Sequence, residues 1–224
     1  MTIPKILHQI WLGPRPVPVM WTRTWQQMNP DFEYRLWTDD AVDGFGLRND
    51  EVYRRFVREG IYDGAADVAR AEILLRYGGV YVDADSVALR PLGDAPFMSA
   101  GFFAQREPND DDPDLVTNAF MGAMPGHPVL ARYVAVHAGI EGLRPMWMVS
   151  GPGALTKVLA AEERNDVMIL PWDTFFTASL WGHGKPSTGK PYAEHFWSTT
   201  AERWGYERAT PYPSASDASR AWTR

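Results

Sequence analysis

The sequence predicts one α/β domain with an open, Rossmann-like mixed sheet that is flanked by helices and is parallel in its first half. Short β-rich apolar runs alternate with helical patterns, and the clearest helix leads directly into an apolar strand. No Gly/Pro/Ser-rich linker divides the 224 residues, a length that suits one such domain.

The first half of the chain is expected to contain three strands and two helices. The predicted strands cover residues 7–12, 33–37 and 80–82, and the predicted helices cover residues 21–28 and 62–77. Asn29-Pro30 ends the first helix, because the residue before proline avoids the α region. In the second helix Ala66, Ala69 and Ile73 share one stripe, and Gly78-Gly79 caps its end.

The second half is expected to be more irregular. Strands are predicted over residues 118–124, 167–170 and 192–197, helices over 128–137 and 151–161, and loops over 106–114 and 181–191. Both loops are candidate lids or acceptor surfaces. The tail after residue 206 is predicted to have little regular structure.

Composition excludes several classes of function. Lys and Arg number 22 against 28 Asp and Glu, which gives a net charge of −6, so the chain is a poor binder of nucleic acid. Cysteine is absent, which excludes disulfides, thiolate nucleophiles and Cys-ligated zinc. The sequence predicts no membrane span, because no stretch of roughly 18 apolar residues occurs. We expect a cytoplasmic protein, since the first residues lack the pattern of a signal peptide.

The most informative motif is Asp83-Ala84-Asp85, at the end of the predicted strand 80–82. Residues i and i+2 of a strand point to the same side, so the two carboxylates would repel unless a cation or hydrogen bonds compensate. Carboxylate oxygens suit Mg²⁺ or Mn²⁺, and ligands bind beyond the carboxyl ends of strands in open α/β sheets. The alternative is a solvated turn that closes the strand.

Three other features admit a functional and a structural interpretation. Asp67 and Arg70 lie three residues apart on the helix 62–77, either as binders of an anionic ligand and its hydroxyls or as an exposed ion pair. Trp11 ends the first strand, where it would stack on a nucleobase or cap the core. His195 lies in an aromatic strand and is either a ligand or a packed residue.

Together these segments resemble the DXD-containing sugar-nucleotide glycosyltransferases, which include outer-chain initiating mannosyltransferases and bacterial capsular polysaccharide enzymes. The resemblance runs in order through most of the chain. It rests on Ile3-Pro4-Lys5-Ile6-Leu7-His8-Gln9-Ile10-Trp11, Asn29-Pro30-Asp31, Tyr34-x-Leu36-Trp37, Ala66-Asp67-Val68-Ala69-Arg70, Tyr77-Gly78-Gly79-Val80-Tyr81-Val82-Asp83-Ala84-Asp85, Asn118, Pro125-Gly126-His127-Pro128, Gly151-Pro152 and His195-Phe196-Trp197.

This resemblance implies a GT-A fold and a set of site residues. The metal, Mn²⁺ or Mg²⁺, is expected on Asp83, Asp85 and His195. The residues expected to bind the donor are Trp11, Asp67, Arg70, Asp83, Asn118 and Trp197. Asp83, Asp85 and Arg70 are expected to be catalytic.

The implied reaction is a metal-dependent transfer of a hexose, with retention, from UDP-hexose or GDP-mannose to a glycan or another hydroxyl acceptor. One domain over residues 1–224 is expected, with a nucleotide-binding half over 1–105, an acceptor-side half over 106–205 and a tail over 206–224. Two alternatives remain open: a haloacid-dehalogenase-like phosphohydrolase that uses Asp83 as nucleophile and Asp85 as acid/base, and a non-catalytic module that binds nucleotide sugars or glycans.

Overall fold

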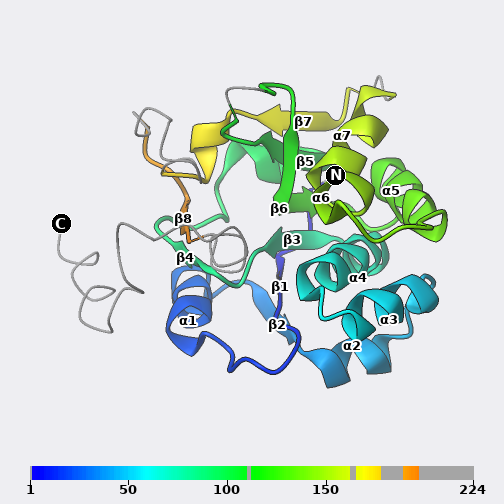
Figure 1. Cartoon of the computed structure of the whole chain (residues 1–224). Helices are drawn as coiled ribbons and strands as arrows, with labels where there is room; N and C mark the ends of the chain where they lie inside the picture. The colour runs from blue at the N-terminus through cyan, green and yellow to red at the C-terminus, as the bar shows by residue number, and fades with distance from the viewer. Residues whose placement is uncertain (1, 110–111, 162–164, 178–188, 197–224) are drawn as a thin grey trace.

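The structure is a computed structural model that describes residues 2–109, 112–161, 165–177 and 189–196. A six-stranded mixed sheet runs through its centre in the order β2-β1-β3-β6-β5-β7, and β4 and β8 form a second, two-stranded sheet (Figure 1). The strands are β1 (Ile6–Ile10), β2 (Glu33–Trp37), β3 (Gly79–Val82), β4 (Ser86–Ala88), β5 (Phe102–Arg106), β6 (Val116–Ala123), β7 (Val167–Leu170) and β8 (Ala193–His195).

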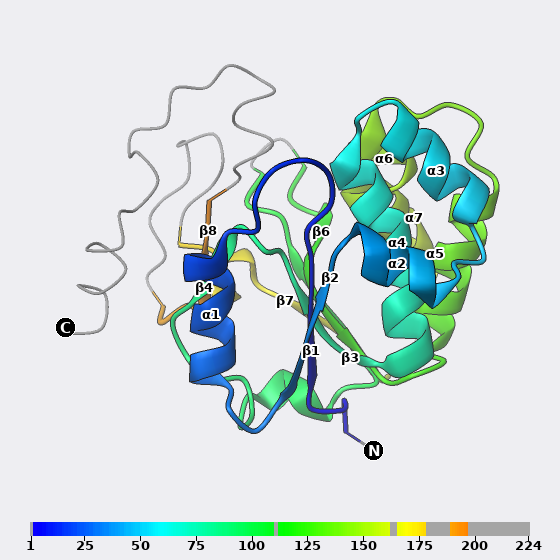
Figure 2. The same cartoon turned by 90° about the horizontal axis from the view of Figure 1, so that it is seen from below.

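Helices cover both faces of the central sheet. The helices are α1 (Val19–Met28), α2 (Asp39–Phe45), α3 (Asp50–Arg58), α4 (Tyr62–Tyr77), α5 (Pro128–Ala138), α6 (Met146–Val149) and α7 (Pro152–Ala160), with short 3₁₀ turns η1 (Pro96–Ser99) and η2 (Trp172–Thr174). Figure 2 shows α2 to α7 on one side of the sheet and α1, β4 and β8 on the other. None of the helices in the described residues is long and apolar enough to cross a membrane.

Strand direction places five strand ends at one edge of the sheet. β1 pairs in parallel with β2 and β3, β5 pairs in parallel with β7, and β6 runs antiparallel to β3 and β5. The edge at which β1, β2, β3, β5 and β7 end is called the carboxyl edge below. β6 begins at this edge, since it runs in the opposite direction. This mixed, partly parallel sheet confirms the predicted fold class.

Helix α4 has the predicted bounds, but its burial is wider than the predicted stripe. Even its polar residues Asp67, Arg70 and Glu72 are at most 5% exposed. The sequence pattern misses this because it does not show that α3 and α5 pack against the polar side of α4. Glu72 accepts hydrogen bonds from the backbone N–H groups of Arg48 and Asn49 at the start of α3, at 2.6 and 2.8 Å, and so joins the two helices.

His8 on β1 links the strands on both sides of it. Its Nε2 donates to the Gly78 carbonyl oxygen at 2.9 Å, and its Nδ1 accepts from the Trp37 indole at 3.1 Å. The neighbouring Gly79 has a φ of +96°, and a Cβ there would lie 2.5 Å from the Ile6 carbonyl oxygen, so only glycine fits between β1 and β3. Burial lowers the pKa of His8 to about 4, and the imidazole is therefore neutral in the folded protein at pH 7.

We expect acid to destabilise the fold through His8. Its pKa is lower in the folded state than the ordinary 6.5, so the unfolded chain binds the extra proton and stability falls as the pH drops from about 6.5 to about 4. The full shift corresponds to a loss of about 3 kcal/mol in the free energy of unfolding. Urea unfolding at pH 7.5 and pH 5 should show a smaller difference for His8→Gln than for the parent chain. An equal difference would contradict this role.

Candidate active site

The diacid motif lies at the carboxyl edge, in the turn between β3 and β4 rather than inside a strand. The Asp83 N–H donates to the Ala119 carbonyl oxygen at 3.0 Å, which extends the pairing of β3 with β6 by one residue. The Asp83 carbonyl oxygen accepts from the Ser86 hydroxyl at 2.6 Å and from Gln9 Nε2 at 3.3 Å. These bonds fix the conformation of the turn. The two carboxylates converge because of this turn, and not because side chains alternate along a strand.

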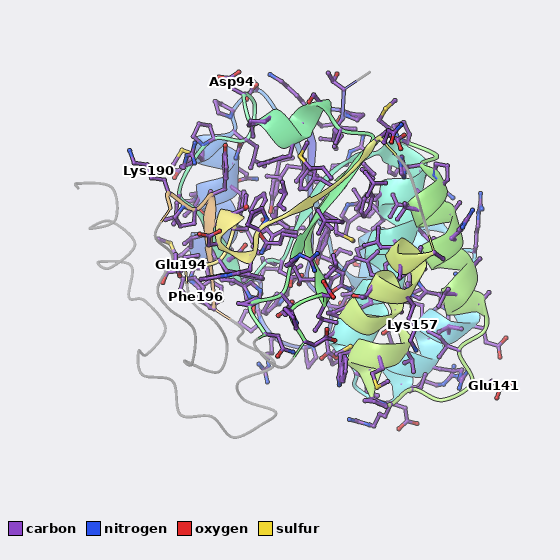
Figure 3. All side chains as sticks on the ribbon, turned by 90° about the horizontal axis from the view of Figure 1, so that it is seen from above. Asp94, Glu141, Lys157, Lys190, Glu194 and Phe196 are labelled. Atoms are coloured by element: carbon purple, nitrogen blue, oxygen red, sulfur yellow. The ribbon has the colours of Figure 1, made fainter. Side chains whose placement is uncertain are left out.

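Strand β8 brings His195 to this turn. His195 pairs with Ser86 in the antiparallel β4–β8 sheet, and the Phe196 N–H donates to the Asp85 carbonyl oxygen at 2.9 Å. The rings of Phe120 and Phe176 lie 5.8 and 5.6 Å from the imidazole. Figure 3 shows the flanking residues Glu194 and Phe196 on the α1 side of the molecule, across from Lys157 and Glu141. His195 is therefore held against the motif on one side of the sheet.

Asp83, Asp85 and His195 form a compact cluster of metal-ligating groups. One ligand atom from each residue lies within 4.8 Å of the other two. Nε2 of His195 is 3.0 Å from Asp85 Oδ1 and 3.4 Å from Asp83 Oδ2. Burial alone would lower the pKa of His195, but the two carboxylates outweigh that effect and raise it to about 10. The cluster thus attracts positive charge strongly.

A buried guanidinium joins the diacid to helix α4. Arg70 Nη1 lies 3.0 Å from Asp83 Oδ1 and donates to the Asn118 carbonyl oxygen at 2.8 Å, and Nη2 lies 3.4 Å from Asp67 Oδ1. The Arg70 and Asp67 side chains are 6% and 5% exposed, so the interpretation as an exposed ion pair is wrong. The Tyr81 ring lies 4.4 Å from the guanidinium carbon, and its hydroxyl donates to Asp83 Oδ1 at 2.7 Å.

Asn118 reaches the site because β6 bulges. The pairing of β5 with β6 passes from Ala104–Met121 directly to Gln105–Thr117, so the three residues from Asn118 to Phe120 have no partner on β5. Within this bulge Asn118 donates from Nδ2 to Asp67 Oδ1 at 2.7 Å. The predicted donor-binding residues Asp67, Arg70, Asp83 and Asn118 are therefore one connected group.

The Asp67 carboxylate accepts hydrogen bonds from more than one segment of the chain, yet burial still disfavours its charged form. Ser150 donates from its hydroxyl to Asp67 Oδ2 at 3.0 Å, and Gly151 is so close that a Cβ there would lie 3.1 Å from that oxygen. Tyr133, which donates to the Ser150 carbonyl oxygen, also accepts from Asn118 Nδ2 at 3.2 Å. Burial raises the pKa of Asp67 to about 7 although Arg70 opposes the shift.

Of the two predicted tryptophans, the structure describes Trp11. Trp11 follows β1 at the carboxyl edge and is partly exposed, and its indole N–H donates to the Arg15 carbonyl oxygen at 2.9 Å. Its role in stacking on a base stays a prediction. Trp197 lies outside the described residues.

Several polar residues at the site were not predicted from the sequence. They are Tyr81, Glu107, Tyr133 and Ser150. Tyr81 could have been found from its position two residues before Asp83 in a strand, which places both side chains on one side. No local signal indicates Tyr133 or Ser150. Ser150, which follows α6, donates to Asp67, and Tyr133 of α5 donates to the Ser150 carbonyl oxygen, so both reach the site through contacts between segments distant in the sequence.

Comparison with known proteins agrees with this geometry. Residues 19–103 match the family described as "Glycosyltransferase sugar-binding region containing DXD motif". The matched segment holds Asp67, Arg70, Asp83 and Asp85. The resemblance to DXD-containing glycosyltransferases is thereby confirmed.

Curated relatives match part of this chain over part of their own length. Inositol phosphoceramide mannosyltransferase 3 of Schizosaccharomyces pombe is 34% identical over 141 residues, which cover 59% of this chain and 36% of that protein. An uncharacterized glycosyltransferase of Acanthamoeba polyphaga mimivirus is 33% identical over 134 residues, which cover 57% of this chain and 52% of that protein. The chain thus spans about a third to a half of the length of these relatives.

Solved structures confirm the GT-A type fold. The PaToxG glycosyltransferase superposes with a TM-score of 0.61 at 18% sequence identity, over 70% of this chain and 69% of that one. The UDP-bound glycosyltransferase domain from the YGT toxin superposes with a TM-score of 0.58 at 11% identity, over 75% and 79% of the two chains. At such identities the likeness concerns the fold alone.

Loss of Arg70 should destabilise the protein because Asp67 and Asp83 would then be left without their shared cation. We expect Arg70→Met to lower the free energy of unfolding by about 3–5 kcal/mol, the usual effect of breaking a buried pair. Arg54 makes exposed ion pairs with Asp43 and Asp50, so Arg54→Met is the matched control and should show no measurable change. Equal urea unfolding curves for the two variants would show that the Arg70 network is not structurally important.

Proposed function

We propose that this protein is a metal-dependent glycosyltransferase that moves a hexose from a nucleotide-diphosphate sugar to a hydroxyl acceptor. One observation carries the proposal: the cluster of Asp83, Asp85 and His195 lies at the carboxyl edge, directly beside the buried Arg70–Asp67 pair. Four of these five residues fall in the segment that matches the DXD family. Ligands of open α/β sheets bind at such an edge.

The three clustered groups fit a divalent cation. Two carboxylates and one imidazole form a mixed oxygen and nitrogen donor set, which suits Mn²⁺ and also accommodates Mg²⁺. Such an ion, when bound, stabilises the negative charge of a departing diphosphate. Arg70 and Tyr81 hold Asp83 Oδ1, which leaves Oδ2 directed toward His195. Both residues therefore position the ligand set.

The connected polar group next to the cluster supports a site for the donor. The curated relatives in yeast are mannosyltransferases by name, and one solved neighbour holds UDP, which supports GDP-mannose or a UDP-hexose as the donor here. We assign the sugar and phosphates to Asp67, Arg70, Asp83 and Asn118. We assign Trp11 and Trp197 to the donor as the resemblance implies, with residues 1–105 as the nucleotide-binding half, 106–205 as the acceptor-side half and 206–224 as a tail.

The chemical step we propose is a front-face substitution with retention. The bond from the anomeric carbon to the leaving phosphate oxygen breaks, a bond from that carbon to the acceptor oxygen forms, and the acceptor proton passes to the leaving phosphate. Asp67 and Arg70 orient the sugar and keep Asp83 in place through the network described above. The acceptor is a glycan or another hydroxyl compound, and a cytoplasmic location stays a prediction.

The haloacid-dehalogenase alternative requires Asp83 as a free nucleophile. Arg70 and Tyr81 both engage its Oδ1, and Oδ2 faces His195. That arrangement suits a ligand-holding carboxylate better than an attacking one. The remaining alternative, a non-catalytic binding module, differs from an enzyme only in turnover.

A panel of nucleotides tests the proposal directly. We expect UDP or GDP to raise the thermal unfolding midpoint of the wild-type chain only when Mn²⁺ is present, because a ligand that binds only the folded state stabilises it. Slow hydrolysis of UDP-glucose or GDP-mannose should accompany that binding and stop when EDTA removes the metal. Stabilisation without hydrolysis or transfer would favour a binding module, and turnover of p-nitrophenyl phosphate would favour the phosphohydrolase.

Substitution of the diacid gives the sharper test. Asp83→Ala and Asp85→Ala should each abolish the manganese-dependent shift and lower turnover by about 10²–10³ or more. Asp94 is an exposed aspartate far from the cluster in the structure, labelled in Figure 3, and Asp94→Ala is the matched control that should behave as wild type. Turnover near the wild-type rate in Asp85→Ala would contradict the assignment of Asp85 as a metal ligand.

A further inference from the structure

Glu107 is a half-buried residue whose carboxyl group has no role in the proposed mechanism. It directly follows β5, in the segment 106–114 that the sequence marks as a polar loop, and its N–H donates to the Leu115 carbonyl oxygen at 2.7 Å. Its Oε2 is buried and has no hydrogen-bond partner within the described part of the chain. A buried acceptor without a donor is costly, so its presence calls for an explanation.

Gln105, two residues earlier, has a buried hydrogen-bond donor that lacks an acceptor within the described part of the chain. It is fully buried, and its Oε1 accepts from the Phe175 N–H at 3.0 Å. Its Nε2, however, has no hydrogen-bond partner among the described residues. Alternation along β5 places Gln105 and Glu107 on the same face of the sheet. An unfilled donor and an unfilled acceptor thus lie two residues apart on one face of the chain.

This face of β5 lies on the same side of the central sheet as β8, the strand that carries His195. Phe103, which alternates with Gln105, packs in the same core cluster as Ala193 of β8. The hydroxyl of Thr117, opposite Gln105 on β6, hydrogen-bonds the Glu107 carboxylate, and the charges of His195 and Asp83 act on it as well. Burial raises the pKa of Glu107 to about 7. The two unfilled groups therefore lie at the carboxyl edge, on the side of the metal-ligating cluster.

We infer that Glu107 Oε2, with Gln105 Nε2 beside it, binds a hydroxyl group of a sugar ring in the active site. A hydroxyl group is both a donor and an acceptor, so a single one satisfies a carboxylate oxygen and an amide N–H together. The inference rests on the proposed function and extends it to a substrate-binding residue on β5. The hydroxyl group belongs either to the donor hexose or to the acceptor. These two possibilities predict different effects of Glu107 variants on hydrolysis and on transfer.

Two substitutions separate a binding role from a structural one. Glu107→Gln keeps the shape, and Glu107→Leu removes all hydrogen bonding. We expect both to raise the thermal unfolding midpoint or leave it unchanged, since they remove an unsatisfied buried carboxyl. Glu194→Gln alters an exposed carboxylate next to His195 and is the matched control for local charge, with wild-type kinetics expected.

Kinetics with the nucleotide that stabilises the wild-type chain identify the source of the hydroxyl. A hydroxyl of the donor predicts that Glu107→Leu lowers kcat/KM for hydrolysis of the nucleotide sugar by about 10- to 100-fold, while the free nucleotide with Mn²⁺ binds as before. A hydroxyl of the acceptor predicts unchanged hydrolysis and the same loss in transfer to methyl α-mannoside or myo-inositol. Glu107→Gln, which keeps one acceptor oxygen, should lose less in either case.

Three results would overturn the inference. The first is wild-type hydrolysis and transfer in Glu107→Leu. The second is weaker binding of the free nucleotide with Mn²⁺, which would place Glu107 in the metal site instead. The third is a fall of several degrees in the unfolding midpoint of both variants, which would show a structural carboxyl. If the wild-type chain binds no nucleotide with Mn²⁺, the proposed function itself fails and the inference falls with it.

Discussion

The site depends on one buried cation. Arg70 projects from α4 and contacts Asp83 after β3, the Asn118 carbonyl oxygen in β6 and Asp67 on its own helix. Removing a guanidinium from water is costly, and the cost is offset only when its N–H groups find acceptors in good geometry. Because those acceptors lie on three different elements, satisfying the cation also fixes the helix and both strands relative to one another. The orientation of the Asp83 carboxylate is therefore set by its contact with Arg70.

A second constraint, the three-residue pairing of β4 with β8, completes the cluster. It is a short sheet, and helix α1 supports it through Trp25, whose indole N–H donates to both the carbonyl and the hydroxyl oxygen of Ser86 at 3.1 Å. His195 is brought across from the far end of the described chain and is buried beside Asp85 and Asp83. Metal-ligating groups from the turn after β3 and from β8 thus converge, and neither segment forms the cluster by itself.

Local sequence signals predicted what local physics determines. The helix 62–77 and the strand that follows it were predicted because Gly78-Gly79 ends the one and an apolar β-rich run forms the other. Strand β5 was missed, since Phe-Phe-Ala-Gln-Arg is buried on both faces and shows no alternation, and α2, α3, β4 and α6 were missed too. Features made by distant contacts escaped the sequence pattern: the burial of the Asp67–Arg70 pair beneath neighbouring helices, and the bulge that carries Asn118. Asp83 and Asp85 were singled out by their spacing after an apolar strand, and His195 was assigned to the metal through the family resemblance. The arrangement that joins the three is a property of the fold.

Burial shifts the pKa values of two histidines and of two carboxyl groups in opposite directions. His8 and His137, whose pKa values burial lowers to about 4, stay neutral, and each has a ring nitrogen that donates to a backbone carbonyl oxygen. Asp67 and Glu107 are different, because burial raises the pKa of each carboxyl to about 7 and the fold accepts that cost at neutral pH. Both carboxyls lie at the carboxyl edge, one on the side of α4 and one on the side of β8. A cost to stability that is concentrated at one edge of the sheet is typical of groups that a bound substrate satisfies.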